Sequence, residues 1–115
     1  MRVPGSFLNR PDPLQAIWAW VCFSGTSGAI YGSFGVTSVT RNATGDYTLT
    51  FEQALAATPY TVMGLGRNDD AATVGYPAMK GATLQTTTSC TMTTHNGAGT
   101  VADNKVVTLM IQGTV

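Results

Sequence analysis

Apolar and polar residues alternate with a period of two along much of the chain. In Tyr47–Phe51 the apolar residues occupy every second position and threonines fill the positions between them. Side chains of a β-strand point alternately to opposite faces, so this pattern predicts a strand with one buried side. Leu84–Thr94 and Val106–Gly113 predict strands of the same kind. The residues expected to face the core in these three strands are Tyr47, Leu49, Phe51, Cys90, Met92, Val107, Leu109 and Ile111.

The stretch Ile17–Phe23 is apolar on both faces. Trp18, Trp20 and Cys22 alternate with smaller aliphatic residues and a phenylalanine. Such a strand is expected to be buried on both sides, with the core on one face and a neighbouring subunit or the N-terminal arm on the other. We interpret Trp18 and Trp20 as buried assembly residues, and sugar stacking is the alternative.

Turn-forming residues divide the rest of the chain. Val36–Thr40 and Tyr47–Phe51 flank Arg41–Asp46, which predicts a hairpin. In Ala29–Thr40, Gly32 and Gly35 suggest a bulge or a close backbone approach. The remaining predicted elements are a loop or single helical turn at Phe51–Ala57, a strand from Pro59 to Leu65, a long loop at Gly66–Tyr76 and a glycine-rich turn at His95–Thr100.

These elements predict an all-β fold, an antiparallel β-sandwich of about seven short strands in residues 17–115, and a barrel is the alternative. Residues 1–16 are expected to form an extended arm, because three prolines interrupt any regular structure there. Phe7 and Leu8 form the only adjacent pair of bulky apolar residues in Met1–Gln15. We interpret this pair as a tether to a neighbouring subunit, and a frayed terminus is the alternative.

Composition favours a protein that packs against copies of itself or a larger particle. Only 10% of residues are charged, 43% are hydrophobic and the formal net charge is zero. So few charges do little to oppose association. The six basic residues are scattered, which argues against a nucleic-acid partner. We expect no secretory signal and no membrane insertion, because Met1–Asn9 lacks a signal pattern and Ala16–Phe23 is too short for a membrane helix.

The chain offers little catalytic chemistry. His95 lies in a polar turn without neighbouring metal ligands, so it is interpreted as a solvated histidine. Asp69 and Asp70 form the only adjacent carboxylate pair and are interpreted as a solvated loop. A calcium or sugar-hydroxyl contact made with Arg67 and Asn68 is the alternative. We therefore expect no enzyme activity, no cofactor and no metal, and the loop residues that could bind a partner are Arg67, Asn68, Asp69, Asp70, Tyr76, His95 and Asn96.

The two cysteines lie in strand-like runs. A disulfide between Cys22 and Cys90 would require an oxidising compartment, and nothing in the sequence indicates one. We interpret both as small buried apolar residues.

Two stretches carry a resemblance to a known family. Ala19–Thr26 and Ser33–Phe51 fit the pattern AWVxFxGT … SxxVxSVTxNxTGDYTxTF, and Leu55 and Pro59–Val62 continue it. The pattern resembles the distal domain of tail fibres and related tail proteins of tailed bacteriophages. The resemblance covers about residues 19–65 and implies a homotrimeric β-sandwich at the virion surface, assembled in the host bacterial cytoplasm, without catalytic residues.

The family pattern leaves two structural functions open. One is a trimeric tail-fibre-like appendage that takes part in host attachment and contacts a host surface glycan or protein through its loops. The other is a capsid decoration, or cement, protein that grips the head through its arm, since only a short arm precedes the domain. A free carbohydrate-binding module and a depolymerase are further alternatives, and the second is disfavoured because no pair of opposed carboxylates is evident.

Overall fold

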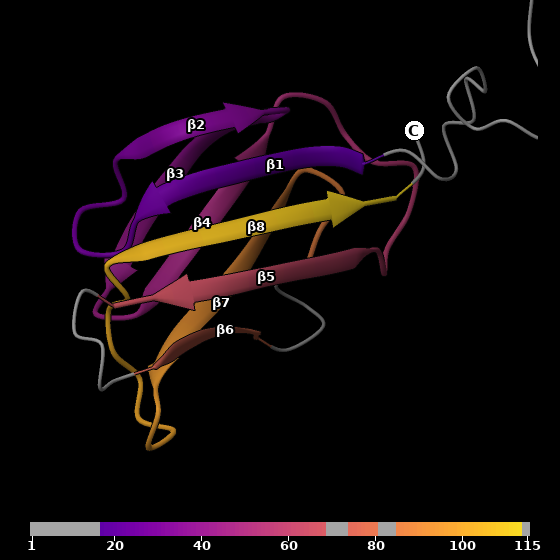
Figure 1. Cartoon of the computed structure of the whole chain (residues 1–115). Coiled ribbons are helices and arrows are strands. Elements are labelled where there is room, and N and C mark those ends of the chain that lie inside the picture. The colour runs from indigo at the N-terminus through magenta and orange to yellow at the C-terminus, as the bar shows by residue number, and fades with distance from the viewer. Residues whose placement is uncertain (1–16, 69–73, 81–84, 114–115) are drawn as a thin grey trace, which may run out of the picture.

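A computed structural model describes residues 17–68, 74–80 and 85–113 of the 115-residue chain. The described residues form eight β-strands and no helix, and therefore include no helix that could cross a membrane (Figure 1). The predicted arm, with Phe7 and Leu8, lies outside these residues. The strands are β1 (Ile17–Ser24), β2 (Ile30–Phe34), β3 (Val36–Ala43), β4 (Asp46–Phe51), β5 (Thr61–Arg67), β6 (Gly75–Met79), β7 (Ser89–Asn96) and β8 (Val106–Gln112).

All eight strands belong to one antiparallel sheet in the order β2-β1-β8-β5-β6-β7-β4-β3. The all-β class is therefore confirmed. The sheet is nearly closed and barrel-like, which corrects the expected sandwich of two separate sheets. The pairing is weak at the centre of the strand order, where the single register pair Gly66↔Gly75 joins β5 to β6. We call β2-β1-β8-β5 the apolar half and β6-β7-β4-β3 the threonine half, and Figure 1 shows the two halves facing each other.

The core lies between the two halves. All eight residues predicted to face inward in β4, β7 and β8 are buried, as the period of two predicted. Phe23 of β1 meets Tyr47 of β4 edge-to-face, with ring centroids 5.2 Å apart. Each half thus contributes one alternating set of side chains to a shared interior. The buried apolar side chains are Ala19, Val21, Phe23, Val36, Tyr47, Leu49, Phe51, Leu55, Cys90, Met92, Val107, Leu109 and Ile111.

Two glycines shape the link between the edge strands. Gly35 separates β2 from β3 and has a φ of 75°, a backbone conformation that residues other than glycine rarely adopt. Gly32 lies under the ring of Trp20, where a Cβ atom would approach the indole to 3.3 Å. The predicted close backbone approach at these glycines is therefore confirmed, and Gly35 forms the corner between the strands.

Several predicted boundaries were wrong. The hairpin loop is shorter than Arg41–Asp46, because β3 continues to Ala43 and β4 begins at Asp46. The loop predicted at Gly66–Tyr76 contains the end of β5 and the start of β6. Strand β6 was missed entirely because Gly75 and Pro77 are poor strand residues. After the end of β4 at Phe51, the residues up to Ala57 form a loop without a helical turn, which confirms the first of the two alternatives predicted there.

Candidate assembly face and loop cluster

A row of exposed apolar side chains crosses the apolar half on its outer surface. Strand register places Phe34 of β2 beside Trp20 of β1, Trp20 beside Met110 of β8, and Met110 beside Met63 of β5. Their exposed fractions are 61%, 40%, 37% and 48% in that order. Neighbouring side chains in one register row form a continuous surface. This row therefore makes an apolar stripe across four strands.

Strand β5 departs from the pattern of an ordinary half-buried strand, because two of its large apolar side chains point to solvent. Its inward positions include Gly64 and Gly66, whereas Met63 and Leu65 point outward and Leu65 is 79% exposed. The inward glycines are required by space, because a Cβ atom at Gly64 would lie 2.4 Å from the side chain of Leu109. An outward Leu in that setting contributes nothing to the core of its own chain. It extends the apolar surface of this half instead.

The edge strand β2 is exposed and carries no protective charge. Ile30 and Tyr31 are 37% and 63% exposed, and the strand contains neither a charged residue nor a proline. Natural edge strands usually carry such residues to prevent pairing with other chains. Only Arg67 is charged among the four strands of the apolar half. We call the outward residues Trp20, Phe34, Met63, Leu65 and Met110 the assembly face.

The outer surface of the threonine half is polar and hydrogen-bonded on β3, β4 and β7, whereas β6 exposes Tyr76 and Met79. Thr48 is the register partner of Thr40 and of Thr91 on the two neighbouring strands. The Oγ1 atoms of Thr48 and Thr91 are 3.1 Å apart, and Asn42 donates to the Thr48 hydroxyl at 2.9 Å. A second row of hydroxyl side chains runs parallel to this one and consists of Ser38, Thr50 and Ser89. These strands therefore present a polar face to solvent, as is common for one side of an antiparallel sheet.

Asp103 anchors the loop before β8 to the β3–β4 hairpin. Its carboxylate lies 2.8 Å from Nη2 of Arg41, and it accepts bonds from the Gly45 amide at 2.7 Å and the Tyr47 hydroxyl at 2.8 Å. Burial alone would raise the pKa of Asp103, but these three donors outweigh it and hold the pKa below its usual value. Burial also raises the pKa of Tyr47 to about 12. The group is a structural brace, because its carboxylate is already engaged by donors.

The predicted loop residues gather at one end of the sheet where the structure describes them. Arg67 ends β5 and Asn68 follows it, Tyr76 is the second residue of β6, and His95 and Asn96 end β7. The pairs Gly66↔Gly75 and Tyr76↔His95 bring these strand ends side by side. Asp69 and Asp70 lie outside the described residues.

The rings of Tyr76 and His95 are stacked, with centroids 5.2 Å apart and 11° between their planes. His95 is half-buried at the end of β7, which corrects the prediction of a solvated turn histidine. Its Nε2 lies 2.8 Å from the Thr93 hydroxyl and its Nδ1 lies 3.3 Å from the carbonyl of Gly99. Both ring nitrogens are therefore occupied, and the imidazole supports the exposed Tyr76 ring.

Asn104 was missed by sequence reasoning, although it is completely buried behind this cluster. Its side-chain nitrogen donates to the carbonyl of His95 at 3.2 Å, while its Oδ1 has no partner. A Cβ atom on Gly66 or Gly75 would lie within 2.4 Å of the Asn104 amide group. The available signal was the pair of glycines in strand-like sequence, which indicates a close approach.

The interpretation of the tryptophans and cysteines was partly wrong. Trp20 is 40% exposed in the single chain, whereas Trp18 packs against the core and its buried Nε1 has no partner. Cys90 is fully buried, but Cys22 is only half-buried because it lies on the outer side of β1. Both cysteines are free thiols, and burial raises the pKa of Cys90 to about 11.

No group of three or more metal-ligating side chains occurs within the described residues. Comparisons with protein-family models, curated proteins and solved structures found no match for this chain. What the chain does must therefore be inferred from its own residues and geometry.

Proposed function

We propose that the chain is a non-enzymatic structural subunit of a tailed-phage virion, a homotrimeric tail-fibre-like appendage held together through its assembly face. The register row Phe34–Trp20–Met110–Met63 carries this proposal. Large contiguous apolar patches on soluble proteins usually mark interaction sites. The resemblance of Ala19–Thr26 and Ser33–Phe51 to tail-fibre distal domains supplies the virion context.

The two sides of the sheet support a subunit that is buried on one side and exposed on the other. The threonine half carries hydroxyls and the ion pair between Lys80 and Asp46, whose atoms lie 2.7 Å apart. Such a surface can face water in the assembled particle. The apolar half has large side chains and almost no charge, so burying it against copies would remove apolar area from water.

Under this proposal the loop cluster faces the host. Tyr76 is 42% exposed and backed by His95, while Arg67 and Asn68 lie on the neighbouring strand end. An aromatic face beside polar side chains suits either a surface glycan or a protein. The cluster lies on β5, β6 and β7 and so leaves most of the assembly face free for subunit contacts.

A capsid decoration protein is the second proposal. In this proposal Phe7 and Leu8 of the predicted arm would grip the shell. In that case deletion of residues 1–15 should abolish binding to capsids, while the remaining domain still forms its oligomer. Unchanged capsid binding by the truncated protein would contradict this alternative.

Immunogold electron microscopy on intact particles distinguishes the two proposals. Label at the tail tip supports the appendage, and label over the head supports the decoration protein. A chain with Tyr76→Ala provides the matched test of host contact, because Tyr76 lies away from the assembly face. Reduced adsorption of particles with an unchanged subunit oligomer is expected. Particles that carry no label at all would contradict the virion assignment.

A further inference from the structure

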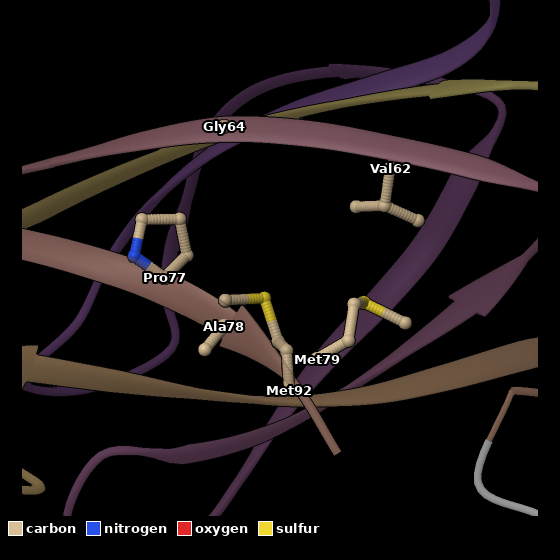
Figure 2. Close-up of a pocket in the computed structure, with 6 residues that line it drawn as sticks. All are labelled: Val62, Gly64, Pro77, Ala78, Met79 and Met92. Carbon is tan, nitrogen blue, oxygen red and sulfur yellow. The ribbon is translucent and has the colours of Figure 1, made fainter. Parts of the chain in front are cut away.

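A pocket lined by residues of apolar type opens at the seam between β5 and β6. It has a volume of about 280 Å³ and is lined by Val62, Gly64, Pro77, Ala78, Met79 and Met92. Figure 2 shows Val62 on one side of the opening, with Met79 and Met92 across from it. Met92 is only 1% exposed, so the pocket reaches the side chains of the core.

The pocket exists because β5 and β6 separate beyond their one register pair. From Thr61 to Leu65, β5 pairs with β8 on one side, and no described strand pairs with its other side. Pro77 lies in β6 opposite this gap and cannot donate a ladder hydrogen bond, as is usual for a proline at a strand edge.

The N-terminal arm joins the sheet at the same end as this pocket. Ile17 pairs with Gln112, and Gln112 pairs with Thr61, which precedes the pocket residue Val62. Neighbouring strands are about 4.8 Å apart, so the first residue of β1 is about 10 Å from the first residue of β5. The eight residues between Leu8 and Ile17 can span more than 20 Å when extended.

The size and chemistry of the pocket match the one bulky apolar pair of the arm. A cavity of about 150 Å³ holds a benzene molecule, so about 280 Å³ accommodates one aromatic ring and one aliphatic side chain. Phe7 and Leu8 supply those two groups. Attachment through a short linker gives an effective concentration in the millimolar range, which favours the arm of the same chain over a second copy.

We propose that the pocket between β5 and β6 is the docking site for Phe7 and Leu8 of the same chain. The docked pair covers the seam, where a single register pair joins the two halves of the sheet. This inference concerns a site separate from the assembly face and does not depend on the proposed tail appendage. It excludes the shell contact of Phe7 and Leu8 that the decoration alternative requires.

The five methionines of the full-length chain allow a direct test by NMR of ¹³C-methyl-labelled methionine. Replacing Phe7 and Leu8 together by serine removes a ring and an aliphatic group from the pocket. The methyl signals of Met79 and Met92 should therefore shift, while those of Met63 and Met110 on the assembly face should not. The matched control Val3→Ser changes another apolar residue of the arm and should leave Met79 and Met92 unchanged.

Three outcomes would overturn the inference. Unchanged Met79 and Met92 signals in the double variant would show that Phe7 and Leu8 do not occupy the pocket. Shifts at Met63 and Met110 instead would place the arm on the assembly face. In a mixture of labelled double variant with unlabelled wild-type chain, return of the wild-type Met79 and Met92 signals would assign the occupant to a second copy. The oligomeric state of wild-type protein, measured separately, tests the proposed assembly.

Discussion

The two halves of the sheet have equivalent inner faces and opposite outer faces. Inside, Leu49 of the threonine half and Leu109 of the apolar half are both buried. Outside, Thr48 bonds to its neighbours on one half, whereas Trp20 lies among exposed apolar side chains on the other. Folding of a single chain requires only the inner pattern. The outer difference is not needed for folding of one chain, and under the proposed function it serves assembly.

We expect the largest losses of stability from truncating buried side chains on the inner faces of the two halves. Leu49→Ala and Leu109→Ala each remove buried methyl groups and leave a cavity, so each should lower the free energy of unfolding by about 2–5 kcal/mol. Urea denaturation of the two variants measures this. A loss below about 1 kcal/mol in only one of them would show that the two halves do not share one well-packed core.

The threonine half should also carry the acid sensitivity of the fold. The bond from Lys80 lowers the pKa of Asp46, and the donors around Asp103 lower its pKa in spite of burial. A carboxyl whose pKa is lower in the folded state stabilises the fold above its unfolded pKa of about 3.9, and this stabilisation is lost as the pH falls through the folded pKa. The free energy of unfolding should therefore decrease as the pH falls below about 5.

Asp103→Asn tests this assignment directly. It should reduce stability at pH 7 by about 1.5–3 kcal/mol, since a hydrogen-bonded charge is lost, and it should weaken the dependence on acid pH. Denaturation curves between pH 3 and pH 7 provide the comparison. An Asp103→Asn protein with the same stability and the same acid dependence as wild type would contradict the bracing role.

The corner that connects the two edge strands should show a smaller effect. Gly35→Ala places a Cβ atom in a backbone with φ of 75° and 3.0 Å from the Cβ of Ala19. We expect a loss of about 1–2 kcal/mol in thermal or urea denaturation. The exposed neighbour Ser33→Ala is the matched control and should change stability by less than about 0.5 kcal/mol. Equal effects for both variants would remove the special role of the corner.

Cysteine labelling sharpens the comparison of inside and outside without altering stability. Cys22 lies on the outer side of β1 and should react with a thiol reagent in dissociated chains and more slowly after assembly. Cys90 is buried, and its raised pKa of about 11 leaves little thiolate at neutral pH, so it should react only on unfolding. Rapid reaction of Cys90 in folded protein would contradict the described core.

Strict alternation made the inner faces predictable, but pairing determined the rest. Tyr47–Phe51 could be interpreted from the sequence because small polar residues mark its outer face. Strand β6 could not, because Gly75 and Pro77 are typical of loops. Here Gly75 leaves space for the buried Asn104 amide, and Pro77 lies beside the open seam. The stack of Tyr76 on His95 depends on the β6–β7 register, which no local pattern specifies.

The assembly face was also only partly predictable. Sequence showed that Ile17–Phe23 is apolar on both sides, yet it could not show that Trp20 aligns with Phe34, Met110 and Met63. Alignment across strands far apart in the chain arises from the fold alone.

Sedimentation velocity of the full-length chain tests the central claim most directly. Wild-type protein should sediment as a trimer. Trp20→Lys introduces a charge at the centre of the assembly face and should give folded monomers, whereas Thr40→Lys on the outer side of β3 should leave the trimer intact. Circular dichroism of both variants is the control for folding. A wild-type protein that stays monomeric at high concentration, or a Trp20→Lys protein that still trimerises, would contradict the account.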